Sequence, residues 1–380
     1  MTRMRNWLVA ALLVVPLLLA GPVRAQETVA REAILIDVTT GQELFARNAD
    51  QPMAPSSLAK LMTAYILFEE LAAGRMNLDD RLLVSEKAWR MRGSRMFVEV
   101  GHEVPVEDLL RGVVINSGND ASVVIAESIS GTEENFAGRM NETALRLGMT
   151  GSHFTTATGW PDPDQYSTAR DIAILAIRII EDFPEYYGYY SETSYGWGEV
   201  DPQNNRNPLL YRDIGADGLK TGYTDDGGYG LAASAVQEGR RLVMVVNGID
   251  SARARSSESE RLMTWGFRSF ENVALFAVGE MVAEAEVWLG EQATVPLVPE
   301  TDLVAVLPRG VRTDMQVVVR YGGPLQAPVV AGQPAAELVV TAPGIEPWVV
   351  TLVAGTDVAE TGFVGRIATA VRQMIGGLLP

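Results

Sequence analysis

The run from Leu58 to Ala73 constrains the fold of this chain more than any other segment. It is rich in Leu, Ala and Met, contains neither Gly nor Pro, and is followed directly by Gly74. Such a run predicts a helix that is buried over most of its surface and ends at a glycine in the C′ position. We therefore expect the other elements of its domain to pack around this helix.

Ser57 and Lys60 lie at the start of the predicted helix, in the sequence P-S-S-L-A-K-L-M-T. At positions i and i+3 their side chains share one face of the first turn. A serine hydroxyl becomes a nucleophile when a base removes its proton, and an amine kept neutral by burial or by nearby cations can be that base. Because S-x-x-K is a short pattern, a serine near an N-cap beside a solvated lysine is the alternative interpretation.

Lysine is rare in this chain. Lys and Arg together number 31, and the lysines are Lys60, Lys87 and Lys220. A guanidinium keeps its proton in proteins, whereas an ammonium can lose it. A lysine in so arginine-rich a sequence is therefore expected to do something that arginine cannot, which favours a chemical role for Lys60 and for Lys220 in G-L-K-T-G.

Length and composition indicate a secreted globular protein. The 380 residues are 47% hydrophobic and 21% charged, enough for two domains. Residues 1–25 read as a secretory signal peptide, because Arg3 and Arg5 precede an apolar run and Val23-Arg24-Ala25 fits a cleavage site. The run is too short to favour a spanning helix. Losing three arginines takes the formal charge from −17 to −20, which argues against nucleic acid as a partner.

The composition also limits the chemistry of a site. The chain has no cysteine, so a thiol nucleophile and disulfides are excluded. Its two histidines, His102 and His153, form no H-E-x-x-H motif and no paired ligand spacing. We expect both to be ordinary surface or hydrogen-bonded histidines, and we expect neither a metal nor a cofactor.

The pattern along the first domain predicts a hairpin, a helical middle, three strands and a closing helix. The hairpin runs from Ala33 to Arg47. Residues Asn116–Asp120 form a tight turn that presents Ser117 and Asn119 between two helices. Residues 85–100 are polar and rich in Met, and we expect loops and short helices there. The other predicted elements are helices 107–115, 121–129, 132–148, 172–180 and 256–270, and strands 218–224, 229–236 and 241–249.

After Asn272 the sequence changes character. Short strands rich in Val and Leu are separated by Pro and Gly, a pattern typical of a small β-sandwich. The predicted strands are 295–298, 303–307, 316–321, 338–341 and 349–354. No catalytic constellation is found in this part.

Three short motifs stand in order: S-L-A-K at Ser57, S-G-N at Ser117 and K-T-G at Lys220. Together S-x-x-K, an S-x-N motif and K-T-G are the signature of class A β-lactamases and penicillin-binding proteins. The surrounding runs, among them M-A-P-S-S-L-A-K-L-M-T, V-I-N-S-G-N-D-A, D-G-L-K-T-G-Y-T and L-M-T-W-G-F-R, resemble the low-molecular-mass penicillin-binding D-alanyl-D-alanine carboxypeptidases of the penicillin-binding protein 5/6 type. The resemblance covers about residues 28–360.

The resemblance implies the fold and the partners. Residues 26–272 would be an α/β (α+β) catalytic domain of the penicillin-binding transpeptidase and β-lactamase type, and residues 273–360 an all-β sandwich domain. The substrate would be the peptidoglycan stem pentapeptide, and β-lactams would be covalent inhibitors. The second domain would lift the catalytic domain from the membrane; a partner-binding module is the alternative.

The resemblance also implies residue roles. Ser57 would be the acylated nucleophile, Lys60 its general base, and Ser117 the hydroxyl that passes a proton to the departing D-alanine. The implied substrate-binding residues are Asn119, Lys220, Thr221, Gly222, Tyr223 and Arg255.

Among these binding residues, Asn119 would position the substrate amide, while Lys220 and Thr221, with Arg255, would face the terminal carboxylate. The backbone N–H groups of Ser57 and Tyr223 would form the oxyanion hole. The family often has histidine after K-T-G, so Tyr223 is a departure that we expect to tune rate or pH response.

Two other functions stay open on the sequence. A class A β-lactamase shares the acylation machinery but needs a carboxylate-activated water for rapid deacylation. No E-x-x-L-N-type segment lies between Ser117 and Lys220, and S-G-N replaces S-D-N, which argues against that activity. A periplasmic scaffold with an inactive site is the non-enzymatic alternative.

The tail, residues 361–380, is predicted to be an amphipathic helix. At 100° per residue its apolar side chains between Phe363 and Leu378 fall within an arc of about 140°. No acid follows Glu360, while Arg366 and Arg372 are basic. We expect this tail to lie on the outer surface of the cytoplasmic membrane and to hold the protein in the periplasm. A helix packed on the β domain is the alternative.

Overall fold

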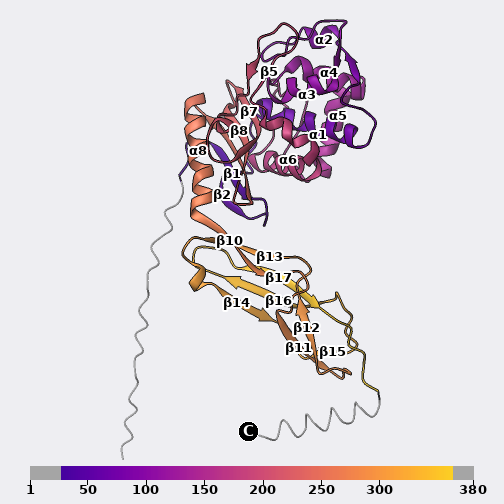
Figure 1. Cartoon of the computed structure of the whole chain (residues 1–380), viewed down its shortest axis with the longest axis vertical. Coiled ribbons are helices and arrows are strands. Elements are labelled where there is room, and N and C mark those ends of the chain that lie inside the picture. The colour runs from indigo at the N-terminus through magenta and orange to yellow at the C-terminus, as the bar shows by residue number, and fades with distance from the viewer. Residues whose placement is uncertain (1–26, 363–380) are drawn as a thin grey trace, which may run out of the picture.

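The computed structural model describes residues 27–362. The predicted signal peptide and most of the predicted tail helix therefore lie outside the described residues. Two domains follow one another along the long axis of the molecule (Figure 1). The first is a mixed α/β domain that ends with helix α8, and the second contains only strands and a short 3-10 turn.

A five-stranded antiparallel sheet forms the middle of the first domain, in the order β2-β1-β9-β8-β7. Its strands are β1 (Glu32–Asp37), β2 (Glu43–Arg47), β7 (Ala216–Thr224), β8 (Gly228–Gln237) and β9 (Arg240–Ile249). All the strands predicted for this domain are thus confirmed, to within two residues at either end.

The sheet is covered on both faces, and alternate residues of its strands supply the two cores. From β1, Ile34 and Ile36 point into the core formed with the helical part of the domain. The intervening Ala33 and Leu35 point into a second core formed with α8, which contributes Leu262 among others. This explains why the predicted strands are apolar throughout and show little alternation.

Among the helices of the first domain, α3, α4, α5 and α6 pack around α1, whereas α8 lies on the other face of the sheet (Figure 1). Their bounds are α1 (Lys60–Ala72), α2 (Glu86–Trp89), α3 (Val106–Val114), α4 (Asn119–Ser130), α5 (Glu133–Arg146), α6 (Ala169–Asp182), α7 (Pro184–Tyr187) and α8 (Ala252–Ser269). The shorter elements are the 3-10 helices η1 (Ser56–Ala59), η2 (Gly188–Ser191) and η3 (Pro208–Tyr211), and the strands β3 (Arg81–Leu83), β4 (Glu103–Pro105), β5 (Ser194–Tyr195) and β6 (Gln203–Asn204).

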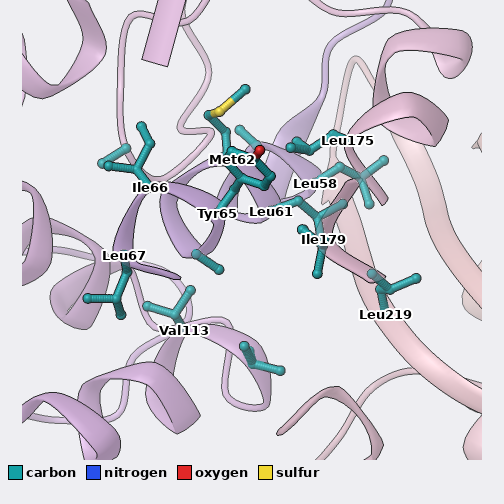
Figure 2. Close-up of a cluster of buried hydrophobic side chains, with 14 of the residues drawn as sticks. Leu58, Leu61, Met62, Tyr65, Ile66, Leu67, Val113, Leu175, Ile179 and Leu219 are labelled. Carbon is teal, nitrogen blue, oxygen red and sulfur yellow. The ribbon is translucent and has the colours of Figure 1, made fainter. Parts of the chain in front are cut away.

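The predicted central helix is confirmed, with one correction at its start. Side chains of α1 meet Val113 from α3, Ile179 from α6 and Leu219 from β7 in one cluster (Figure 2). The residues around Ser57, however, form the 3-10 helix η1, and the α-helix begins only at Lys60. A 3-10 turn has three residues per turn, so it aligns side chains at i and i+3 more closely than an α-helix does.

Three other predicted helix starts are wrong by two to four residues. Helix α6 begins at Ala169, not at 172, because the Thr168 hydroxyl accepts a hydrogen bond from the Asp171 N–H at 3.0 Å. Helix α4 begins at Asn119, not at 121, because Gly118 takes the N-cap position and the tight turn ends there. Helix α8 begins at Ala252, not at 256, because the Ser251 hydroxyl accepts a hydrogen bond from the Ala254 N–H at 3.1 Å. Arg255 therefore lies in the first turn of α8.

The second domain is all-β, as predicted. Six of its strands form one sheet in the order β14-β16-β17-β12-β11-β15, and β10 pairs with β13 in a second, two-stranded sheet. The bounds are β10 (Phe270–Phe276), β11 (Ala283–Trp288), β12 (Thr294–Val298), β13 (Leu303–Pro308), β14 (Gln316–Arg320), β15 (Leu325–Gln326), β16 (Pro334–Thr341) and β17 (Trp348–Ala354), with the 3-10 turn η4 (Arg312–Asp314). Strands β10, β11 and β15 were not predicted from the sequence, and the predicted domain boundary at 272/273 falls inside β10.

Within residues 27–362, no helix has the length and apolar character needed to cross a membrane.

Candidate active site

Ser57 and Lys60 are brought together by η1 and the first turn of α1. The Lys60 Nζ atom lies 3.1 Å from the Ser57 Oγ atom. The Ser57 side chain is partly exposed, whereas Lys60 is 1% exposed. The nucleophile candidate can thus be reached from solvent while its neighbouring amine is enclosed, which overturns the alternative of a solvated lysine.

Two further acceptors hold the Lys60 amine. Its Nζ donates to the Asn119 side-chain oxygen at 2.7 Å and to the Thr158 backbone carbonyl at 2.5 Å. Burial, together with the positive charge of Arg206, lowers the pKa of Lys60 from 10.5 to about 7, although Asp120 and Glu133 oppose this shift. With such a pKa about half of the amine is unprotonated at pH 7 and can accept a proton.

Ser117 and Asn119 lie at the junction between α3 and α4. Ser117 has φ of +61° and is 2% exposed, and its hydroxyl has no hydrogen-bond partner among the described residues. An unsatisfied buried hydroxyl is costly, so its retention points to a partner that arrives with the substrate. Asn119 is fixed by donating from its side chain to the Arg92 carbonyl at 2.6 Å and from its N–H to the Ser94 carbonyl at 2.8 Å.

Asp120 holds the loop that supplies those carbonyls. Its carboxylate accepts hydrogen bonds from the backbone N–H groups of Met96, Phe97 and Val98 at 3.1, 2.8 and 3.3 Å. A carboxylate in the first turn of α4 is also favoured by the helix dipole. The loop at residues 92–98 is therefore tied to the same helix as Asn119.

Lys220 lies on β7 in a strongly cationic environment. It is 3% exposed, and its amine donates to the Thr221 carbonyl at 3.2 Å. Burial holds the pKa of Lys220 well below its usual value, and the charges of Lys60, Arg206 and Arg255 lower it further. A carboxylate that entered this region would reverse these effects and bring a proton back to Lys220.

Arg255 reaches the same region from α8. Its guanidinium donates to the Arg206 carbonyl at 3.2 Å, lies over the Tyr229 ring at 5.8 Å, and keeps a buried Nε–H without a partner among residues 27–362. Burial lowers the pKa of Arg255 to about 10, so the group stays cationic at neutral pH.

Gly222 and Tyr223 follow on β7, where the strand passes η1. A Cβ atom on Gly222 would lie 3.2 Å from atoms of Leu58, Pro55 and Ser56, so a larger residue would push η1 and β7 apart by a few tenths of an ångström. The Tyr223 side chain is 50% exposed; its hydroxyl donates to Asp225 at 2.7 Å. The Tyr223 ring lies 4.3 Å from that of Tyr229.

Comparison with known proteins identifies the family. A model of the D-alanyl-D-alanine carboxypeptidase family matches residues 21–251, more than half of the chain, and a model described as the penicillin-binding protein 5 C-terminal domain matches residues 270–360. The chain belongs to the serine-type D-alanyl-D-alanine carboxypeptidases. These findings support the carboxypeptidase interpretation over the β-lactamase and scaffold alternatives.

Individual relatives resemble this carboxypeptidase in sequence and structure over most of its length. It is 37% identical to the D-alanyl-D-alanine carboxypeptidase DacA of Haemophilus influenzae over 344 residues, which cover 89% of this chain and 87% of the relative. A crystal structure of penicillin-binding protein 5 from Haemophilus influenzae superimposes with a TM-score of 0.82 at 37% identity, covering 88% of this chain and 99% of that one. Penicillin-binding protein D2 from Listeria monocytogenes, in its ampicillin-bound form, gives a TM-score of 0.59 at 29% identity, covering 64% and 98%.

The site residues predicted for the carboxypeptidase lie on five elements and one turn: Ser57 on η1, Lys60 at the start of α1, Ser117 in the turn before α4, Asn119 at the start of α4, Lys220 to Tyr223 on β7, and Arg255 on α8. Lys60 contacts Ser57 and Asn119 directly. Three groups were missed: the Thr158 carbonyl, the Arg206 guanidinium, and the loop at residues 92–98. A backbone carbonyl has no residue-type signal, and Arg206 is one arginine among many, so the sequence offered no means of finding them. Within the described residues no group of His, Cys, Asp and Glu side chains could hold a metal ion.

Proposed function

We propose that this carboxypeptidase removes the terminal D-alanine of peptidoglycan stem pentapeptides through an acyl-enzyme on Ser57. The observation that carries this proposal is the 3.1 Å contact between the Ser57 hydroxyl and the buried Lys60 amine, whose pKa of about 7 makes it a usable base at neutral pH.

The reaction proceeds in two displacements. Lys60 accepts the Ser57 proton as Oγ attacks the carbonyl carbon of the penultimate residue, and the N–H groups of Ser57 and Tyr223 stabilise the oxyanion. The C–N bond then breaks, and the leaving D-alanine takes a proton through the Ser117 hydroxyl. Water, deprotonated by the same base, cleaves the ester and restores the Ser57 hydroxyl.

The cationic region around Lys220 selects the free carboxylate of the substrate. Lys220, Thr221 and Arg255 are proposed to bind it, with Arg206 contributing charge at the rim. Without an anion, burial and the neighbouring charges of Arg206 and Arg255 disfavour the protonated form of Lys220, and an entering carboxylate would favour it. This requirement distinguishes a carboxypeptidase from an endopeptidase, because an internal residue presents no carboxylate at that position.

β-Lactams are proposed to acylate the same serine. The ring amide is opened by Ser57 as a substrate amide would be, but the remainder of the molecule stays attached and the ester persists. The ampicillin-bound form of penicillin-binding protein D2 supports this proposal.

The decisive experiment measures D-alanine release from a pentapeptide together with mass spectrometry of the penicillin-labelled protein. We expect release by the wild type, one equivalent of label on the peptide containing Ser57, and no label on Ser57→Ala with an unchanged melting temperature. Labelling of Ser57→Ala at the wild-type rate would refute the assignment. Rapid turnover of penicillin without persistent label would favour a β-lactamase instead.

We also propose that the mature protein acts in the periplasm, on the outer surface of the cytoplasmic membrane. The support is the sequence alone: residues 1–25 resemble a signal peptide, and residues 363–378 divide into an apolar and a basic face. Spanning is disfavoured, since Arg366 and Arg372 would each cost roughly 2.5–3.5 kcal/mol near the bilayer centre.

Flotation with anionic liposomes tests the attachment. The mature chain is expected to float in low salt. A chain ending at Thr361 should stay soluble and still hydrolyse small peptides, and Arg366→Glu/Arg372→Glu should bind more weakly. If the full mature chain remains in the soluble fraction with lipid present, the proposal is wrong.

A further inference from the structure

The backbone segment that contacts the Lys60 amine is clamped from two sides. At Ala157 the N–H donates to a Glu133 carboxylate oxygen at 3.1 Å, and the carbonyl accepts from the Thr63 hydroxyl at 2.6 Å. The next carbonyl along the chain, that of Thr158, is the one that accepts from Lys60 at 2.5 Å. These two contacts restrain the peptide units on either side of Ala157. The N–H of the unit that carries the Thr158 carbonyl, that of Gly159, donates to the Thr156 hydroxyl at 3.1 Å, so the whole segment that presents this carbonyl is held in place.

The Glu133 carboxylate that accepts from the Ala157 N–H is buried. It is the first residue of α5, directly after the Thr132 N-cap, and its side chain is 9% exposed. Its second oxygen lies 3.0 Å from the Lys87 amine. A buried carboxylate needs a counter-charge and hydrogen bonds, and Lys87, the Ala157 N–H and the α5 N-terminus provide them.

Lys87 is the third lysine of the chain, and the catalytic roles above leave it unused. Its amine contacts Glu133 and, at the same distance of 3.0 Å, Glu134. The two acids differ in two respects: the Glu134 side chain is 75% exposed, and it makes no hydrogen bond to the segment at 157–158. The chain therefore contains its own matched control for Glu133.

We propose that Glu133, held by Lys87, is a positioning residue for Lys60: it aims the Thr158 carbonyl at the Lys60 amine and adds a negative charge that favours the protonated amine. This inference rests on the proposed role of Lys60 as the base. Lys87 would then also belong to this site, although it would contact Glu133 and not the substrate.

The charge effect has a definite sign because the charged groups around Lys60 are known. Arg206 and Lys220 disfavour the protonated amine, whereas Asp120 and Glu133 favour it, and burial is the largest influence of all. Removing the charge of Glu133 should move the deprotonation of Lys60 to lower pH. Removing the charge of Lys87 should move it to higher pH, because the Glu133 carboxylate would then be uncompensated.

The test is the rate of Ser57 acylation by a penicillin from about pH 5.5 to about pH 9 in four variants. Glu133→Gln keeps an oxygen for the Ala157 N–H and should lower the midpoint by at least about 0.3 pH units, with the plateau rate nearly unchanged. Lys87→Met should raise the midpoint by a similar amount. Glu134→Gln should leave both quantities unchanged.

Glu133→Ala separates the positioning effect from the charge effect. It removes the acceptor as well, so its plateau rate should fall about 10-fold to 100-fold, since a misplaced group of the reacting set costs that much. The melting temperature of each variant, and the label bound at saturation, report whether the protein remains folded.

The experiment distinguishes failure of the proposal for Glu133 from failure of the proposed function. If the wild-type rate shows no rise near neutral pH, Lys60 is not the base and the function proposal fails at that step. If the wild type shows the rise but Glu133→Gln and Lys87→Met leave the midpoint unmoved, or move it in the same direction, the present inference is wrong. A lower melting temperature with an unmoved midpoint would make Glu133 purely structural.

Discussion

The amines of Lys60 and Lys220 are both buried, but the groups around them differ. Lys60 donates to a hydroxyl, a side-chain amide and a backbone carbonyl. Lys220 donates to a single neighbouring carbonyl and faces three other cations. Burial lowers the pKa of both amines, so burial alone does not make a base. The neighbouring groups distinguish the two amines: Lys60 lies within hydrogen-bond distance of the Ser57 hydroxyl whose proton it is proposed to accept, whereas Lys220 lies among cations and is proposed to bind an anion.

Of the changes that test this difference, replacing Lys60 by arginine should have the largest effect on the acylation rate. Lys60→Arg keeps the charge but cannot lose its proton, so the acylation rate should fall about 10³-fold, close to that of Lys60→Ala. Stopped-flow acylation by a chromogenic penicillin measures it. If the arginine variant kept most of the rate, Lys60 would act only through its charge.

The region around Lys220 should make kcat/KM depend on the negative charge of the substrate's terminal carboxylate. In the wild type, replacing the terminal carboxylate of the peptide by a carboxamide should lower kcat/KM about 10-fold to 100-fold, the usual value of a charged hydrogen bond. In Lys220→Met or Arg255→Ala the same substrate change should cost only a few-fold, because the partner is already missing. Equal losses in wild type and variants would remove these residues from carboxylate binding.

The pH dependence of the wild-type acylation rate tests the proposed role of Lys60. The pKa of Lys60 is about 7, and the neutral amine is the form proposed to act as the base. Acylation should therefore be slow below that pH, rise as the pH passes through about 7, and level off above it. A rate that fell over this interval would show that a protonated group is required instead.

The smallest expected effect concerns Tyr223. Its backbone, not its ring, is proposed to stabilise the oxyanion, and its ring packs on Tyr229 at the edge of the site. Tyr223→His should change kcat/KM by no more than about threefold above pH 8, while adding a titration near 6.5, where an imidazole loses its charge. A loss of more than tenfold at high pH would mean that the tyrosine ring contacts the substrate.

The success of sequence prediction differed from element to element for physical reasons. The strands of the central sheet were found because both of their faces are apolar. The start of α8 was missed because Ser251, Ser256 and Ser257 are all possible N-caps, and only the fold selects the first. Strand β11 was missed because its Ala and Glu residues have low strand propensity, and its pairing with β12 stabilises it.

The same contrast holds for the site. The sequence by itself determined which residue types could react: a serine and a lysine three residues apart, a second serine with an asparagine, and a lysine before Thr-Gly. Their order and their local settings were enough to identify the chemistry, because these constraints act over a few residues.

Only the tertiary structure decided which charges and carbonyls surround them. The Thr158 carbonyl lies 98 residues beyond Lys60 along the chain yet 2.5 Å from its amine, and the Glu133 carboxylate is added by another helix. The proton affinity of an amine depends on the desolvation and the charges within a few ångströms of it. Those are properties of packing between distant segments, and no local pattern encodes them.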